Sequence, residues 1–175
     1  MCPWTAENVW GLLEGRVVDR TTAAVEAERW RRAGEIVALT NGCFDILHVG
    51  HLLPFLWAAR LADRVIVGVN DDASVRSLKG PERPINPDRE RALLLAALRM
   101  VDRVVIFSER TADQLMRVVR PHFYVKGGDY TLATLPEAAT VREIGTRVLF
   151  VPVVAGRSTT GIVARIRAKE TAGRE

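Results

Sequence analysis

One stretch decides the fold: residues 36–51 have the sequence IVALTNGCFDILHVGH. An apolar run over Ile36–Thr40 is followed by a turn that contains Gly42 and then by a helical segment. A short apolar run that passes directly into a helix is typical of a strand buried on both faces of a parallel sheet. The stretch therefore predicts the first strand-to-helix unit of an α/β domain.

Short β-branched runs and helical segments alternate along the rest of the chain. Further strands are expected over Arg64–Asn70, Arg103–Phe107, His122–Lys126 and Arg147–Val154. Helices are expected over His51–Ala62, Asp88–Met100, Thr111–Arg120, Pro136–Ile144 and Ser158–Lys169, after two leading helices over Thr5–Leu13 and Thr21–Ala33. This order predicts a Rossmann-like, doubly wound α/β fold with a five-stranded, mainly parallel sheet and helices on both faces. We expect one domain over residues 35–170, a helical lead-in over 1–34 and a tail over 171–175.

The composition of the 175 residues is that of a globular protein, with 48% hydrophobic and 26% charged residues. The net charge of +4 is too small and too scattered to indicate a nucleic-acid partner. Cys2 and Cys43 form no disulfide framework, and Cys43 lacks the partner pattern of a nucleophile, so we expect a small residue at a strand end. No signal peptide or membrane-spanning run is visible. We therefore expect a cytoplasmic protein without a membrane partner.

Polar and glycine-rich segments follow the predicted strands. They occupy residues 41–45, 70–72, 127–129 and 156–160. In a doubly wound sheet, ligands bind beyond the carboxyl ends of the strands, where the strand order reverses. These segments therefore predict one ligand site at that rim.

Two histidines stand where the first strand leads into a helix. His48 and His51 are three residues apart, so they can face one direction. Gly50 permits close approach of a ligand, and the free N–H groups of a helix N-terminus attract anions. This arrangement predicts a cradle for a polyphosphate. A zinc pair is the alternative, but zinc needs further ligands, and the chain has one other histidine, His122, so no metal site is expected.

A second phosphate-type element, residues 156–160, precedes the last helix. Ser158 or Thr159 can be the N-cap of that helix. Their hydroxyls, the free amides and the nearby Arg157 can also hold phosphate oxygens. No dinucleotide-binding or P-loop glycine motif is present.

Together these motifs resemble the cytidylyltransferase-like nucleotidyltransferase superfamily, with H-x-G-H after the first strand and S-T-T before the last helix. The resemblance runs from Ile36 to Ile166. Within the superfamily the chain is most similar to heptose 1-phosphate adenylyltransferases, through the segments Thr40–Asp45, Val69–Val75, Leu78–Gly80, Val125–Tyr130 and Gly156–Thr160. The resemblance implies transfer of AMP from ATP to a heptose 1-phosphate, giving ADP-heptose and pyrophosphate.

The resemblance also implies roles for individual residues. Catalytic roles fall on His48, His51 and Lys79, the last expected on a loop. Nucleotide contacts fall on Gly42, Cys43, Phe44, Gly50, Lys126, Asp129, Arg157, Ser158, Thr159 and Thr160. Acceptor contacts fall on Asp45, Asp72, Arg83, Arg91 and Arg99. Arg91 and Arg99 are equally compatible with a solvated helix face, and Asp45 with a cap on its own turn.

The resemblance further implies Mg²⁺ carried by the triphosphate, a homodimer, and a separate sugar kinase that supplies the acceptor. Two segments depart from the family pattern: Leu135–Ala139 replaces a glycine- and acid-containing stretch, and the first helix carries the bulky Leu53–Phe55 and Trp57. Both lie where acceptor specificity can be set.

Three alternatives remain open. A glycerol 3-phosphate-type cytidylyltransferase usually carries Gly-Asp-Asp-Trp at the Lys126–Tyr130 segment, unlike this chain. A GTP-using heptose 1-phosphate guanylyltransferase differs only in the base. A nucleotide sensor without catalysis is expected to lose a histidine or the Ser-Thr pair, and both are present here. A class I aminoacyl-tRNA synthetase also uses an H-x-G-H element but is not among these three, because we would expect a longer chain and a K-M-S-K-S-like loop.

Overall fold

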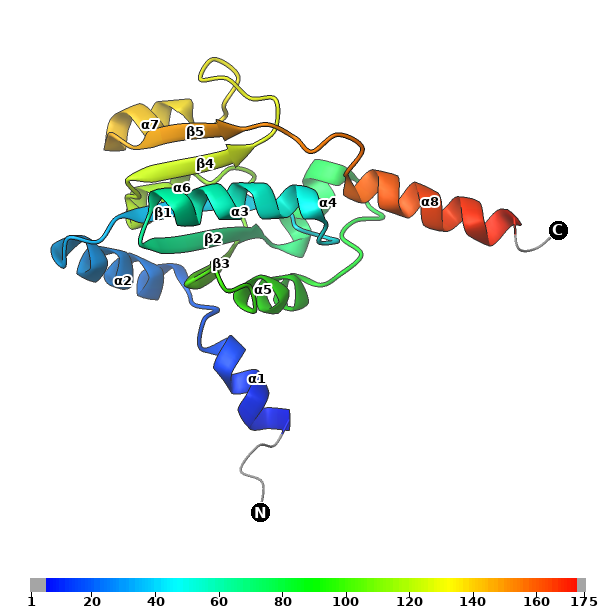
Figure 1. Cartoon of the computed structure of the whole chain (residues 1–175), viewed down its shortest axis with the longest axis horizontal. Helices are drawn as coiled ribbons and strands as arrows, with labels where there is room; N and C mark the ends of the chain where they lie inside the picture. The colour runs from blue at the N-terminus through cyan, green and yellow to red at the C-terminus, as the bar shows by residue number, and fades with distance from the viewer. Residues whose placement is uncertain (1–5, 173–175) are drawn as a thin grey trace.

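The computed structural model describes residues 6–172 and contains a five-stranded parallel sheet (Figure 1). The strand order is β3-β2-β1-β4-β5, and every neighbouring pair is parallel. The strands are β1 (Val37–Gly42), β2 (Arg64–Asn70), β3 (Arg103–Phe107), β4 (Phe123–Gly127) and β5 (Arg147–Val151). From β1 the chain winds outward through β2 and β3, then returns to β4 on the other side. The predicted doubly wound fold is confirmed, and the strand order reverses between β1 and β4.

Helices cover both faces of this sheet. One face carries α2 (Arg20–Arg32), α6 (Asp113–Val119) and α7 (Ala138–Ile144), and the other carries α3 (Val49–Leu61) and α5 (Asp88–Ala96). The short helix α4 (Asp72–Lys79) follows β2, while α1 (Ala6–Glu14) and α8 (Thr159–Ala172) extend away from the body of the domain (Figure 1).

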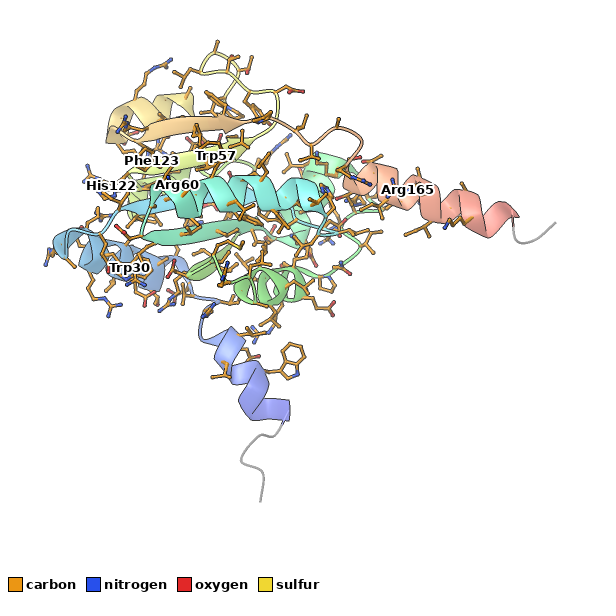
Figure 2. The ribbon with its side chains drawn as sticks, viewed as in Figure 1. Trp30, Trp57, Arg60, His122, Phe123 and Arg165 are labelled. Atoms are coloured by element: carbon orange, nitrogen blue, oxygen red, sulfur yellow. The ribbon has the colours of Figure 1, made fainter. Side chains whose placement is uncertain are left out.

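The helix α2 is part of the sheet's own core. Ala23, Ala27 and Trp30 of α2 are buried in one cluster with residues of α6 and of the strands. The guanidinium groups of Arg64 and Arg103 lie 5.5 and 5.9 Å from the centre of the Trp30 ring, which Figure 2 labels. The expected boundary at residue 34 therefore places α2 outside the domain in sequence, although α2 packs on the sheet of that domain.

Several element ends differ from the sequence predictions for identifiable reasons. The helix α4 was not among the predicted helices, and Asp71 caps it by accepting the Ser74 N–H at 2.7 Å. Lys79 is accordingly the last residue of a helix, and its predicted loop position is wrong. At the other end of the domain, β5 stops at Val151 because Pro152 has no N–H to donate to the ladder.

Two further differences from the sequence predictions concern the C-terminal ends of helices. The helix α5 ends at Ala96, whose carbonyl accepts a hydrogen bond from the Arg16 guanidinium at 3.1 Å. The helix α8 continues through Ala172, so residues 171 and 172 of the predicted tail are helical, and residues 173–175 lie outside the described residues. Thr5 of the predicted first helix also lies outside them. Over the part of the chain that the structure describes, no helix has the length and apolar character to cross a bilayer.

Candidate active site

A cleft of about 620 Å³ opens at the carboxyl ends of the strands. Most of the predicted site residues line it: Gly42, Cys43, Phe44, Asp45, His48, Gly50, His51, Lys79, Arg83, Lys126 and Arg157–Thr160. Four predicted residues do not line it: Asp72, Arg91, Arg99 and Asp129. Other residues that line the cleft were not predicted as site residues; they include Asn41, Arg110, Thr111, Tyr130, Glu137 and Pro152–Val154.

The two histidines stack at the N-terminus of α3. Their ring centroids are 3.8 Å apart, with 24° between the planes. Phe44 fixes the inner ring, because it meets His51 edge to face with 5.4 Å between centroids. Gly50 is required here, since a Cβ atom would lie 2.9 Å from the His48 ring. The two imidazoles therefore face one direction, as predicted, and tight packing holds them there.

Hydrogen bonds set the protonation of both rings. The Nδ1 atom of His48 accepts the Gly50 N–H at 3.1 Å, and the Nδ1 atom of His51 accepts the His48 N–H at 3.4 Å. A neutral imidazole whose Nδ1 accepts carries its proton on Nε2. Burial lowers the pKa of both rings, and that of His51 falls to about 4 through burial and the adjacent His48. At neutral pH each ring is therefore an uncharged donor through Nε2.

A second helix N-terminus lies against the first. Ser158 is the N-cap of α8, because its Oγ accepts the Gly161 N–H at 3.0 Å, which confirms one of the two caps considered. Thr159 donates to the carbonyl of Ile46 at 3.4 Å, which ties the start of α8 to the loop before α3. The N-termini of both helices and the hydroxyls of residues 158–160 thus line one side of the cleft, an environment suited to phosphate groups.

Arg91 is fully buried and holds the rim together. Its guanidinium donates to the carbonyls of Cys43, Asn70 and Asn86, the last two at 2.8 and 2.9 Å. It also donates to the carboxylate of Asp72 at 2.8 Å. Because each of its three guanidinium nitrogens donates within the protein, Arg91 acts in the scaffold and does not face an acceptor phosphate. Asp72 is held by Arg91, and its predicted contact with an acceptor hydroxyl stays a prediction.

Asp45 and Arg83 form a second internal brace. The buried carboxylate of Asp45 binds the Arg83 guanidinium and accepts the backbone N–H groups of Ile85 and Asn86 at 2.7 and 3.0 Å. Asp45 therefore holds the loop before α5 instead of capping its own turn. Arg99 is exposed after α5, away from the cleft wall, so its contact with an acceptor stays a prediction.

Lys126 stands at the floor of the cleft among polar partners. Its Nζ donates to Tyr124 Oη at 2.9 Å, Asn41 Oδ1 at 3.2 Å and Glu137 Oε1 at 3.3 Å. Burial lowers the pKa of the Lys126 amine, and the charge of Glu137 opposes that change. Burial, aided by the same carboxylate, raises the pKa of Tyr124. The pair Lys126–Glu137 is thus a buried ion pair with additional hydrogen bonds, as such a pair requires.

Other candidate chemistries find less support in the cleft. Burial raises the pKa of the Cys43 thiol, which disfavours a reactive thiolate. His122 lies at the far end of β4 from α8 (Figure 2), where its Nδ1 accepts the Val37 N–H at 3.0 Å. Within the described residues, no three His, Cys, Asp or Glu side chains are grouped to hold a metal ion.

Sequence reasoning gave no role to several polar residues of the cleft wall. Asn41 lies in the polar segment 41–45 that was expected at the rim but was not singled out, and Thr111 lies beyond the end of β3, outside any recognisable motif. For Glu137 there was a signal, since it lies in the Leu135–Ala139 stretch that departs from the family pattern. The departure from the family pattern drew attention to this position but did not indicate what Glu137 does.

A parallel sheet whose switch point carries two helix N-termini and two neutral imidazoles defines a nucleotidyltransferase-type α/β domain. The chain belongs to the cytidylyltransferase-like family, whose model matches residues 39–171.

Individual relatives agree with this family. Proteins named bifunctional protein HldE from Mesorhizobium japonicum and Gluconacetobacter diazotrophicus are 46% and 47% identical to the chain over 155 and 158 residues. These alignments cover 89% and 90% of this chain but 31% and 33% of the relatives, so the chain spans about a third of their length. The crystal structure of a lipopolysaccharide core biosynthesis protein from Thermoplasma volcanium GSS1 is similar with a TM-score of 0.58 and 27% identity, covering 69% of this chain and 98% of that one.

The protonation of His51 is a testable consequence of this packing. In the free protein we expect a pKa of about 4 and a proton on Nε2 above that pH. Between pH 6.5 and 4 the unfolded chain takes up a proton at this residue and the folded chain does not. The contribution of His51 to stability is therefore full above pH 6.5 and declines as the pH falls toward 4. Long-range ¹H–¹⁵N NMR spectra from pH 4 to 8, assigned with His51→Asn, measure the pKa of His51 and show which ring nitrogen carries the proton. Titration near 6.5 or a proton on Nδ1 would contradict the geometry.

Arg91 and Arg99 give a matched pair of substitutions. We expect Arg91→Met to lower the free energy of unfolding by about 3 kcal/mol, because it leaves three carbonyls and the Asp72 carboxylate without their cation. The exposed Arg99→Met should change it by less than about 0.5 kcal/mol. Urea denaturation compares the two, and equal small effects would show that Arg91 does not support the rim.

Proposed function

We propose that this chain transfers AMP from ATP to a heptose 1-phosphate and releases pyrophosphate. The observation that carries the proposal is the meeting of the α3 and α8 N-termini beside the Nε2 atoms of His48 and His51. This arrangement offers neutral donors to a polyphosphate, and the cleft-wall carboxylates Asp45 and Glu137 are each paired with a cation of the protein.

The reaction needs positioning more than proton transfer. A phosphate monoester has a second pKa of about 6, so it is mostly a dianion at neutral pH and can attack without a general base. Attack on the α-phosphorus is in line with the departing pyrophosphate, and charge accumulates on the leaving oxygens. The Nε2–H groups of His48 and His51 and the helix amides would stabilise that charge, because they are fixed donors in a partly buried site.

The cleft divides into regions that suit the parts of the two substrates. The donors at α3 and α8 suit the triphosphate. Gly127, Gly128 and Pro152–Val154, at the ends of β4 and β5, offer backbone and apolar surface that suits a nucleoside. Lys79, at the end of α4, would attract the acceptor's phosphate, while Arg83 in the loop after α4 lines the cleft but is already paired with Asp45. Asp129 is exposed beside the glycines, and its contact with the nucleotide stays a prediction.

Magnesium would enter this site bound to the nucleotide. Asp45 and Glu137 are the carboxylates on the described cleft wall, and both are paired with cations of the protein. Mg²⁺ would therefore be bound by the triphosphate and water, as it often is. When bound, it would neutralise phosphate charge.

The choice of sugar and base rests on resemblance. The segments Val69–Val75 and Val125–Tyr130 are similar to heptose 1-phosphate adenylyltransferases, and the structural relative is described as a lipopolysaccharide core biosynthesis protein. The relatives called bifunctional protein HldE support the same assignment. We also propose a cytoplasmic location and a separate kinase reaction that supplies the sugar phosphate.

A pyrophosphate-release assay tests the function. With five nucleoside triphosphates against a panel of phosphosugars, we expect ATP with a heptose 1-phosphate to be used at least about tenfold better than other pairs, because a missing hydrogen bond in a buried site lowers the rate by that order. CTP with glycerol 3-phosphate would replace the heptose assignment, and GTP with the heptose would change only the base. Tight nucleotide binding without pyrophosphate release would favour a sensor.

The histidines provide the control for that assay. His48→Ala and His51→Ala should each lower turnover by roughly 10²–10³, as expected for loss of one fixed donor. Unchanged melting temperatures would show that the fold is retained. Near-normal turnover in either variant would remove the proposed role of the pair.

We also propose that the chain forms a homodimer through the α3 and α5 face. Leu56 and Trp57 of α3 and Leu94 of α5 are exposed by 44–51%, which leaves more apolar surface than the sheet can cover. Trp57 is labelled on α3 in Figure 2. Sedimentation should give a dimer at micromolar concentration and a monomer for Trp57→Glu. A wild-type chain that sediments only as a monomer would contradict this.

A further inference from the structure

A polar cluster reaches the cleft from the sheet face opposite the histidines. Tyr124 of β4 belongs to the core beneath α2, α6 and α7, while Val125 belongs to the core beneath α3 and α5. Side chains alternate along a strand, so Lys126 points to the same face as Tyr124. Glu137, which directly precedes α7, completes the cluster on that face. The phosphate donors at α3 and this cluster therefore lie on different sides of one cleft.

The charges of this cluster cancel. Lys126 Nζ and Glu137 Oε1 are 3.3 Å apart, and the two side chains are 12% and 2% exposed. Glu137 also accepts the Ala112 N–H at 3.1 Å, which fixes its position. A neutral pair of this kind has no net attraction for a phosphate or an ammonium group. It suits uncharged groups that both donate and accept hydrogen bonds.

The cluster also has hydrogen-bonding capacity to spare. Four oxygen atoms compete for the three hydrogens of Lys126 Nζ, so an acceptor hydroxyl can receive one of these hydrogens by replacing the longest contact, the 3.5 Å one to Glu137 Oε2. Thr111 donates its hydroxyl proton to Asp113 at 2.5 Å, so its oxygen remains an acceptor. Asn41 Oδ1 accepts from Tyr124 and Lys126, while its Nδ2 makes no hydrogen bond within the described part of the chain. Both donors and acceptors are thus available to a ligand.

The chemistry of the transfer decides which substrate reaches this region. In-line displacement requires the acceptor oxygen on the side of the α-phosphorus opposite the leaving pyrophosphate. The helix termini of α3 and α8 hold the pyrophosphate side, and the apolar end of the cleft at β5 suits the nucleoside. The polar region near the ends of β1, β3 and β4 remains for the body of the acceptor.

We infer that Asn41, Thr111, Lys126 and Glu137 form the subsite that binds the hydroxyl groups of the acceptor sugar. This inference rests on the proposed function and changes one sequence prediction, since Lys126 was expected to contact the nucleotide. It also gives a role to Glu137, the acidic residue in the stretch that departs from the family pattern. Glu137 positions Lys126, and Lys126 contacts the substrate.

Acceptor discrimination tests the subsite. The ratio of kcat/KM for the sugar 1-phosphate to kcat/KM for ethyl phosphate, which lacks the hydroxyls, is measured in the pyrophosphate-release assay. Lys126→Met and Thr111→Val should each lower this ratio by about tenfold or more, because sites that bind hydroxyls discriminate through those bonds. The KM for ATP should stay within about threefold. Thr21→Val, an exposed change on α2, is the matched control and should leave the ratio unchanged.

The possible outcomes distinguish a failure of the subsite inference from a failure of the proposed function. A raised KM for ATP with an unchanged ratio would assign Lys126 to the nucleotide and overturn the inference. Equal loss of activity on both acceptors would indicate a structural role and would also overturn it. If Lys126→Met does not fold, Thr111→Val and Glu137→Gln decide the question. A wild-type protein that is inactive with every sugar phosphate would contradict the proposed function itself.

Discussion

The buried guanidinium of Arg91 is the interaction on which the rim of the sheet depends. A buried charge is unfavourable unless it is paired, and Arg91 achieves this with three carbonyls and one carboxylate from three separate segments. Its planar guanidinium carries five N–H donors in a fixed geometry and can therefore reach acceptors in several parts of the chain. The loop after β1, the end of β2, the start of α4 and the loop before α5 are therefore fixed relative to one another. Asp45 strengthens the same connection through Arg83 and the Ile85 and Asn86 amides.

The phosphate region is built on this fixed rim from neutral groups. His48 and His51 are stacked so closely that two positive rings would repel each other, and their Nδ1 atoms are already used as acceptors. Fixed neutral donors and helix amides can stabilise a developing anion without the large desolvation penalty of buried cations. Positive charge is placed farther out, on Lys79 and Arg157, which are exposed. Under the proposed function, this separation would allow phosphate binding in a cleft that remains accessible.

The sequence predicted the parts of the structure that depend on local pattern. The apolar runs located every strand, and the H-x-G-H and S-T-T elements located one wall of the cleft, because glycine, N-cap and helix-start chemistry are local. The role of Arg91 was not predictable, since its partners come from residues 5 to 48 positions away. The same holds for Lys126 and Glu137, which meet only after α7 packs on the sheet. The short helix α4 was missed because its eight residues carry few apolar positions, and its cap depends on Asp71.

The central claim is that this cleft transfers the nucleotidyl group, not the terminal phosphoryl group, of a nucleoside triphosphate. Parallel reactions with [α-³²P]ATP and [γ-³²P]ATP and a heptose 1-phosphate distinguish the two chemistries directly. The structure predicts that the α label appears in the sugar nucleotide and the γ label only in pyrophosphate. Transfer of the γ label to the sugar, or retention of both labels in ATP, would contradict the account.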